Sequence, residues 1–178
     1  IRKWHRLTGS SNSSVSGNKV KDAGSSGIFI QSSSDHSSIS SNVIKDPGTY
    51  GIYSSSCDYI SVLGNTCDKS ASTNYGFYLL SSEYNTCSGN TVSNFSRGIY
   101  ANNSDYSSIS SNIINAGVYG IYIHLGTSCN ISSNIVAGGS SHELYFTSST
   151  ECVVNGNNDA GGTTSTSGCT SCTVVNNR

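Results

Sequence analysis

The sequence predicts an all-β fold, a single-stranded parallel solenoid of about eight coils with 22–25 residues per coil. Three observations point to it. An asparagine motif recurs at a nearly constant step, a glycine-aromatic motif keeps the same step, and the residues of both motifs favour strands and turns over helix. Ser and Asn supply 40 and 19 of the 178 residues, a composition also typical of disordered linkers. The regular recurrence of apolar residues argues against disorder, and the length fits one domain, residues 1–178.

The first motif reads apolar, small, small, Asn, any residue, apolar, and it marks one corner of each coil. Its asparagines are Asn18, Asn42, Asn65, Asn90, Asn112, Asn134 and Asn157, followed by Asn177. Successive members are 24, 23, 25, 22, 22, 23 and 20 residues apart. Asn tolerates the left-handed backbone conformation that a tight turn favours, so we expect it to adopt that conformation here. We also expect its amide to bond the turn backbone and the Asn amides of the coils above and below.

The second motif is a short strand in which an aromatic residue lies between apolar ones. It follows Gly27, Gly51, Gly76, Gly98 and Gly120, and Glu143 replaces the glycine in the sixth copy. Because side chains alternate across a strand, inward apolar neighbours turn the aromatic residue outward. The predicted outward ladder is Phe29, Tyr53, Tyr78, Tyr100, Tyr122 and Tyr145, widened by Tyr50, Tyr75 and Tyr119 just before three of the glycines. Tyr suits protein interfaces and sugar rings, so the ladder indicates contact with another chain or a glycan; stacking within the sheet is the third interpretation.

Together the two motifs resemble the right-handed parallel β-helix repeat family, which includes pectate-lyase-like enzymes and phage tailspikes. The resemblance covers nearly all of residues 8–178 and implies a right-handed winding. That family contains polysaccharide lyases, hydrolases and epimerases, and also structural and binding rods without catalysis. The resemblance therefore leaves the activity open.

An acidic file and an aromatic file precede the corner asparagines in four consecutive coils. Seven residues before each Asn are Asp35, Asp58, Glu83 and Asp105, and six before are His36, Tyr59, Tyr84 and Tyr106. Unit charges about 4.8 Å apart repel by roughly 0.9 kcal/mol even in water, so the acidic file should face solvent or hold cations. Calcium is the candidate cation, and no other cofactor is expected. The two files together could bind a sugar, or they could be a solvated edge copied by duplication.

For catalysis, an enzyme of this family would need a compact group of carboxylates, or a basic residue beside a carboxylate. The candidates are His36 with Asp35 and Asp58, and the neighbouring pairs at residues 45–46 and 68–69. An active site usually interrupts a repeat pattern once, and these positions follow the pattern instead. The sequence therefore favours a protein without catalytic activity.

Three of the seven cysteines occupy the same place in their coils. Cys129, Cys152 and Cys172 each lie five residues before a corner Asn, at a separation compatible with a disulfide between neighbouring coils. The sequence thus predicts a Cys129–Cys152 or a Cys152–Cys172 bridge. Cys169 and Cys172 have a spacing that zinc sites use, but no second pair accompanies them.

Charge and composition restrict the partners. The net charge of -1 argues against a nucleic-acid surface, and the longest apolar runs are too short to cross a membrane. Residues 1–7 are expected to form an N-terminal arm or partial coil and residues 159–178 an irregular last coil, in what looks like an excerpt or processed part of a longer protein. Exposed coil edges favour self-association or covering by neighbouring domains.

These features predict an extracellular, cell-surface or virion-surface rod, a non-catalytic structural or adhesive segment of a fibre, spike or filament. The alternative is a tailspike-like enzyme that degrades polysaccharide along the acidic and aromatic files. An ice- or surface-binding solenoid would need regular outward Thr rows, and Thr residues fall into register only at residues 163–166.

Overall fold

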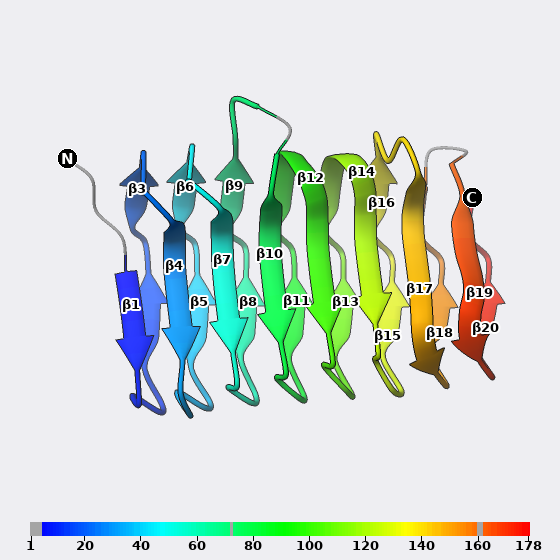
Figure 1. Cartoon of the computed structure of the whole chain (residues 1–178), viewed down its shortest axis with the longest axis horizontal. Helices are drawn as coiled ribbons and strands as arrows, with labels where there is room; N and C mark the ends of the chain where they lie inside the picture. The colour runs from blue at the N-terminus through cyan, green and yellow to red at the C-terminus, as the bar shows by residue number, and fades with distance from the viewer. Residues whose placement is uncertain (1–4, 72, 160–161) are drawn as a thin grey trace.

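The computed structural model describes residues 5–71, 73–159 and 162–178, and these residues form a parallel β-solenoid. The coils stack side by side along a rod with the two termini at opposite ends, as Figure 1 shows. Strands of successive coils pair in parallel and in register along the rod. The predicted fold class is confirmed, and the rod of about seven turns is close to the eight coils expected. Residues 1–4 of the expected N-terminal arm and residues 160–161 of the last coil lie outside the described residues.

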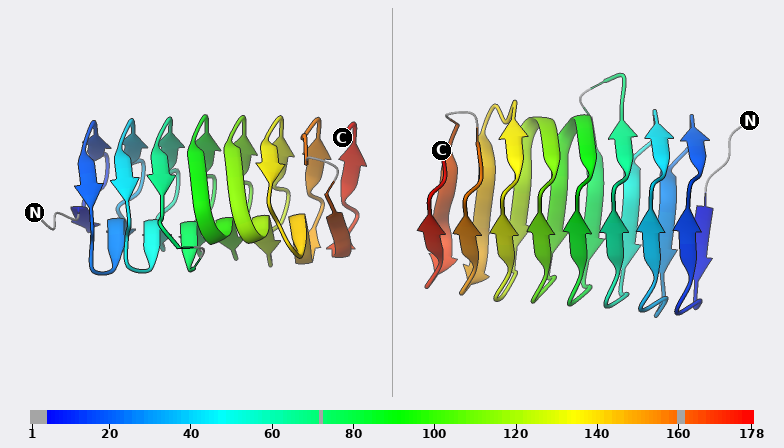
Figure 2. Two further views of the ribbon diagram at one scale, coloured as in Figure 1. Left: turned by 90° about the horizontal axis from the view of Figure 1, so that it is seen from above. Right: turned by 180° about the vertical axis from the view of Figure 1, so that it is seen from behind.

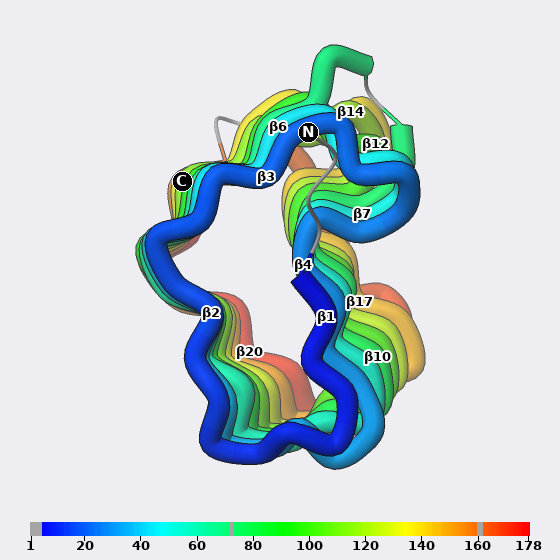
Figure 3. Tube along the Cα trace, turned by 90° about the vertical axis from the view of Figure 1, so that its left-hand side faces the viewer, coloured from blue at the N-terminus to red at the C-terminus, as the bar shows by residue number. Residues whose placement is uncertain are grey.

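Three rows of strands form the sides of the rod (Figures 2 and 3). The front row in Figure 1 is β1 (His5–Thr8), β4 (Ser26–Gln31), β7 (Tyr50–Ser55), β10 (Tyr75–Leu80), β12 (Thr91–Asn102), β14 (Ile113–His124), β17 (His142–Thr150) and β19 (Thr164–Thr170). The rear row is β2 (Ser14–Ser16), β5 (Ser38–Ser40), β8 (Ser61–Leu63), β11 (Thr86–Ser88), β13 (Ser108–Ser110), β15 (Asn130–Ser132), β18 (Val153–Asn155) and β20 (Thr173–Val175). The third row contains β3 (Lys19–Lys21), β6 (Val43–Lys45), β9 (Thr66–Asp68) and β16 (Ile135–Ala137), and it pairs with the first residues of β12 and β14.

The asparagines stack at the corner between the rear row and the third row. Their side chains are almost fully buried from Asn42 to Asn157, and each Nδ2 donates to the Oδ1 of the next Asn at 2.9–3.2 Å. Each Oδ1 that accepts this bond also accepts one from the backbone N–H of the preceding rung, for example from Asn65 to Asn90 at 2.8 Å. The predicted asparagine ladder is confirmed.

One detail of the corner differs from the prediction. The left-handed residue is the small residue before each Asn, with φ between 53° and 66°, as at Ser41, Gly64 and Gly89. The asparagine itself is absent from the positive-φ residues at all ladder positions of the described chain. The residue with the left-handed conformation is therefore an outward-facing Gly, Ser or Asn. The ladder Asn can then point its amide inward. Buried amides need hydrogen-bond partners, and the neighbouring asparagines supply them.

The core consists of columns of Ile, Val, Leu, Cys and Phe inside the rod, as the sequence predicts. The glycine of the second motif belongs to this packing. A Cβ on Gly98 would lie 2.3 Å from Ile114 Cγ2 and 2.6 Å from the Gly120 carbonyl oxygen, so the front row approaches the third row too closely for a side chain. At the place of the next glycine, Glu143 is buried and its Oε2 accepts the backbone N–H of Thr163 at 2.7 Å. The glycines thus fix the distance between two sides of the rod.

The rod contains strands and turns and no helix among its described residues. No helix of the described chain could therefore serve as a membrane span.

Candidate functional site

Two columns of mostly aromatic side chains cover the front row from β4 to β17, and we call this surface the tyrosine face. The first column is Phe29, Tyr53, Tyr78, Tyr100, Tyr122 and Tyr145, whose successive ring centroids are 4.7–5.2 Å apart. The second is Tyr50, Tyr75, Arg97, Tyr119 and His142, which lie in register across β7, β10, β12, β14 and β17. Rings of the two columns also touch one another, for instance Tyr50 and Tyr53 at 4.7 Å. The outward ladder predicted from the sequence therefore exists and is two columns wide.

The local backbone explains why two aromatic residues three positions apart point the same way. Between Tyr50 and Tyr53, the residues Gly51 and Ile52 are both buried. Strict alternation would send one of them outward, so the strand is irregular at the glycine. The same buried pair occurs in β10, β12, β14 and β17. A single irregularity, repeated in these five strands, thus doubles the aromatic width of the face.

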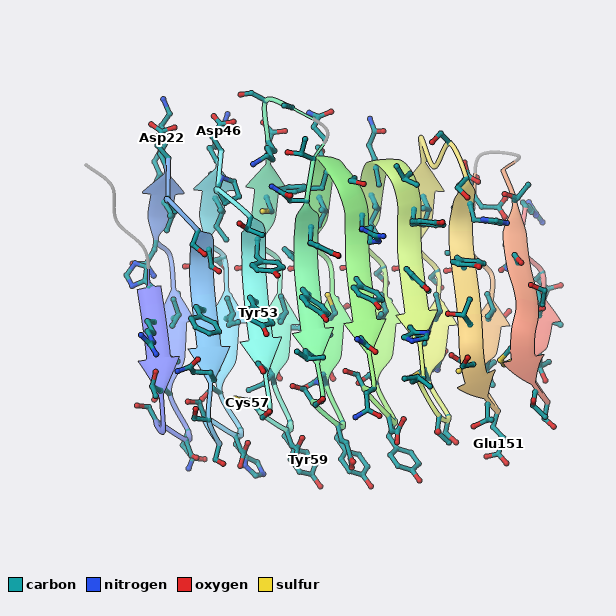
Figure 4. All side chains as sticks on the ribbon, in the orientation of Figure 1. Asp22, Asp46, Tyr53, Cys57, Tyr59 and Glu151 are labelled. Atoms are coloured by element: carbon teal, nitrogen blue, oxygen red, sulfur yellow. A yellow bond between two sulfur atoms is a disulfide. The ribbon has the colours of Figure 1, made fainter. Side chains whose placement is uncertain are left out.

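The rings are stacked on one another along the rod. Phe29 and Tyr53 are within 2° of parallel, Tyr78 and Tyr100 within 11°. Because neighbouring rings overlap, part of each ring face is covered by the next coil, and all of these side chains are half-buried. Ring edges and hydroxyl groups then remain for a partner. Two of the hydroxyls already accept bonds within the face, Tyr78 from Asn102 at 3.4 Å and Tyr122 from Thr147 at 3.1 Å. Figure 4 shows this surface toward the viewer, with Tyr53 labelled.

Arg97 is the one cation in the second column among the described residues. Its guanidinium carbon lies 5.0 Å from the ring centroid of Tyr75, 5.9 Å from that of Tyr100 and 5.5 Å from that of Tyr119. Its Nε is buried and has no hydrogen-bond partner in the structure. An arginine between aromatic faces gains cation–π attraction, and its terminal N–H groups still suit a carboxylate or another acceptor.

The surroundings of the tyrosine face favour neutral phenols. Burial raises the pKa of Tyr100 to about 12, with a further contribution from repulsion by Tyr122, Tyr78 and Tyr75. Burial likewise raises the pKa of Tyr50. The hydroxyl groups of Tyr50 and Tyr100 therefore stay protonated at physiological pH and can act as both donors and acceptors.

The second aromatic file lies on a different edge of the rod. His36, Tyr59, Tyr84 and Tyr106 all adopt positive φ, between 53° and 57°, and stack at 4.6–4.9 Å along the lower edge in Figure 4, where Tyr59 is labelled. The three tyrosines are 43–49% exposed. Sequence reasoning placed this file beside the acidic file, and the structure does so, on a turn that the tyrosine face does not include.

The acidic file has a structural role in the turn. Asp35 Oδ1 accepts the backbone N–H of Asp58 at 2.9 Å, and Asp58 Oδ1 accepts that of Glu83 at 2.8 Å. Asp105 Oδ1 accepts the backbone N–H of Thr127 at 2.7 Å. The three aspartates thus bind the turn of the following coil, and the other oxygen of each carboxylate is the atom that could meet a cation.

The structure does not assemble the catalytic candidates into an acid-base group. His36 stacks on Tyr59, while the carboxylates of Asp35 and Asp58 bond to backbone amides of the next coils. In the other candidate pairs, Asp46 Oδ1 accepts bonds from the backbone and hydroxyl of Ser70, which lower the pKa of Asp46, and Lys69 Nζ donates to backbone carbonyls. These contacts stabilise turns.

The cysteines pair differently from the prediction. The disulfide joins Cys169 to Cys172 within the last coil, whereas Cys129 and Cys152 are free and buried. Cys129, Cys152 and Cys172 share a column, as their spacing predicts, but Cys169, three residues before Cys172, also reaches it and forms the bond. Among the described residues, three metal-ligating side chains come within 4.8 Å of one another only at Cys152, Cys169 and Cys172.

Sequence reasoning missed Arg97 and His142 as members of the tyrosine face. The signal was present, because both occupy the place before the motif glycine or its replacement, where Tyr50, Tyr75 and Tyr119 stand in other coils. Two hollows lie at the ends of the rod. One of about 370 Å³ is lined by Arg6, residues 24–26 and Phe29, and one of about 380 Å³ is lined by residues 156–158 with Asn176 and Arg178.

Comparisons with solved structures show the same fold in two proteins. A mutant of DFA-IIIase from Arthrobacter chlorophenolicus A6, in complex with DFA-III, has a TM-score of 0.62 and 15% identity over 79% of this chain and 38% of its own. The Dettilon tailspike protein has a TM-score of 0.62 and 14% identity over 86% of this chain and 43% of its own. The chain thus spans less than half the length of either protein.

No curated protein matches the sequence. The family described as "Right handed beta helix region" matches residues 6–178. Since this match includes the asparagine ladder and the whole tyrosine face, the chain belongs to the right-handed β-helix family.

Proposed function

We propose that the protein is an extracellular structural or adhesive β-solenoid, a segment of a surface fibre, spike or filament, and that its tyrosine face binds another polypeptide. The partner is a second copy of the chain or a neighbouring part of the same protein. The observation that carries the proposal is the continuous half-buried ring surface over six coils. Surfaces of this size and composition mark protein contacts, where Tyr and Arg are enriched.

The ring geometry favours a polypeptide over a glycan on this face. Sugars stack on exposed ring faces, and here neighbouring coils cover part of each face. Ring edges, hydroxyls and the Arg97 guanidinium instead suit a surface that supplies both apolar atoms and hydrogen-bond acceptors. The tailspike neighbour and the disulfide support a location outside the cell or on a virion.

Sedimentation of the chain at micromolar concentration tests the proposal. The wild type should associate, and a Tyr78→Ser/Tyr100→Ser variant should sediment as a monomer. The matched control is Tyr59→Ser/Tyr84→Ser, which removes two stacked tyrosines from the turn file and should associate like the wild type. Equal loss of association in both variants would contradict the proposal, and a monomeric wild type would exclude a second copy of the chain as the partner.

A polysaccharide-degrading enzyme is the second candidate, because the neighbouring DFA-IIIase binds DFA-III on the same fold. Release of sugar from a panel of acidic and neutral polysaccharides, with and without calcium, tests it. Activity that disappears in an Asp35→Asn/Asp58→Asn variant would favour this candidate over the structural one. We expect no release, since those carboxylates bond to backbone amides.

A further inference from the structure

The last two coils bring three sulfur atoms together at one corner. The sulfurs of Cys152, Cys169 and Cys172 lie within 4.8 Å of one another. Cys169 and Cys172 are bonded, and Cys152 is a free thiol beside the bond. Its own backbone N–H donates to Cys172 Sγ at 3.3 Å. A free thiol this close to a disulfide is placed to react with it.

The backbone supports an alternative pairing. β18 and β20 are in register, and Thr173 N–H donates to the Cys152 carbonyl at 2.9 Å, so Cys152 and Cys172 lie directly opposite on neighbouring coils. In-register neighbours are about 4.8 Å apart, inside the Cα separation of about 4.4–6.8 Å that disulfides span. The Cys169–Cys172 bond has a Cα separation of 5.7 Å, also inside it. Both bridges fit the same backbone.

We propose that these three cysteines form a thiol–disulfide exchange site whose bond moves between Cys169–Cys172 and Cys152–Cys172. The Cys152 thiol loses its proton and its sulfur attacks Cys172 Sγ. The Cys152–Cys172 bond forms as the Cys169–Cys172 bond breaks, and Cys169 leaves as a thiolate that takes up a proton. One disulfide and one thiol are present before and after, so no outside oxidant or reductant is needed.

The surroundings of Cys152 support its role as the attacking group. A hydrogen bond from the Cys129 thiol lowers the pKa of Cys152, against the opposing effect of burial. The reactive form of a cysteine is the thiolate, so a lower pKa raises its population. Cys129 is itself buried and lies opposite Cys152 on the preceding coil.

The two isomers differ in what they constrain. The Cys169–Cys172 bond closes a loop with a sequence separation of 3, within one coil. A Cys152–Cys172 bond would span 20 residues and tie the last coil to the one before it. Longer closed loops restrict the unfolded chain more, so the second isomer holds the C-terminal end of the rod more firmly. The exchange therefore acts as a lock on the exposed last coil.

Peptide mapping distinguishes the isomers, because cleavage before Asp159 separates Cys152 from Cys169 and Cys172. The oxidised wild type is incubated at mildly alkaline pH, its free thiols are blocked in acid with denaturant, and it is cleaved on the amino side of aspartates. The Cys169–Cys172 isomer yields residues 159–178 as a separate peptide. The Cys152–Cys172 isomer yields that peptide linked to residues 105–158.

We expect both products from the wild type and loss of the linked product in Cys152→Ser. The matched control Cys129→Ser removes the other cysteine of the 105–158 peptide and keeps a hydroxyl donor beside Cys152, so the linked product should still be present at equilibrium. Cys169→Ser, oxidised in air, should contain the linked product as its disulfide. The inference is wrong if the wild type yields only the separate peptide, if it contains no disulfide, or if the linked product persists in Cys152→Ser.

Discussion

Replacement of Asn90 by alanine removes a rung from the middle of the ladder. Asn90 is 1% exposed, and its Oδ1 accepts bonds from the backbone N–H of Asn65 at 2.8 Å and from the Asn65 amide at 3.0 Å. Its Nδ2 donates to the carbonyl of Val62 and to Asn112 Oδ1, both at 2.9 Å. These four bonds and a longer one from Nδ2 to Cys87 Sγ at 3.4 Å are therefore lost together.

The expected cost follows from which groups keep a partner. The Asn65 amide still donates to the carbonyl of Ile39, and Asn112 Oδ1 still accepts the backbone N–H at position 90. The buried backbone N–H of Asn65 loses its acceptor, which costs about 1–3 kcal/mol, and the other bonds contribute about 0.5–1.5 kcal/mol each. We therefore expect the free energy of unfolding to fall by about 4 kcal/mol.

Urea unfolding followed by far-UV circular dichroism measures this difference. Asn18→Ala is the matched control, because Asn18 is half-buried and donates only to the carbonyl of Ser16 and to Asn42. Its loss should cost about 1 kcal/mol. A free energy of unfolding for Asn90→Ala within about 0.5 kcal/mol of the wild type, or equal to that of Asn18→Ala, would refute the reasoning.

Three further predictions concern the packing and the buried groups. Gly98→Ala should lower the free energy of unfolding by about 1–3 kcal/mol, because its Cβ would meet Ile114 and a backbone carbonyl. A Cβ at Gly24 would meet nothing within 4 Å, so Gly24→Ala should change the free energy of unfolding by less than about 0.5 kcal/mol. Equal losses of stability for the two variants in urea unfolding would contradict this prediction. The raised pKa of Tyr100, about 12 against an ordinary value of 10, stabilises the fold below pH 10 and loses this effect as the pH rises toward 12. Tyrosinate absorbance should show one high-pH titration fewer in Tyr100→Phe, and an unchanged high-pH region would argue against burial. Burial also raises the pKa of the Cys67 and Cys87 thiols, so a thiol reagent should label neither residue in the native protein and both in denaturant, with native labelling as the contrary result.

The winding of the chain was predictable because the repeat constrains it in every coil. The Asn spacing gave the length of each coil and the stacked amides, and the alternation around Tyr53 and Tyr78 predicted which way the rings point. Which corner residue takes the left-handed conformation was not predictable from residue type, since Gly, Ser and Asn all tolerate it. The residue before each Asn adopts the left-handed conformation because the ladder Asn must direct its amide inward.

The site was less predictable because it depends on side-chain contacts between coils that do not follow the repeat spacing. The acidic side chain of Asp58 looks the same in the sequence whether it binds a cation, a sugar or a backbone amide. Only the structure shows that its Oδ1 accepts the backbone N–H of Glu83. The pairing of Cys169 with Cys172 depends on the shape of one irregular coil. Arg97 interrupts a tyrosine column, and a column of three tyrosines was too short to make the interruption visible.

The central claim is that residues one coil apart lie directly over one another, and an engineered crosslink tests it. Ser88 and Ser110 are in register on β11 and β13, with their hydroxyl oxygens 3.3 Å apart. A Ser88→Cys/Ser110→Cys variant should form a disulfide on oxidation, seen as a link between the peptides on either side of Asp105. A Ser88→Cys/Ser108→Cys variant is displaced by two residues, about 8 Å between Cα atoms, and should not. Crosslinking of the displaced pair as readily as the in-register pair would contradict the winding.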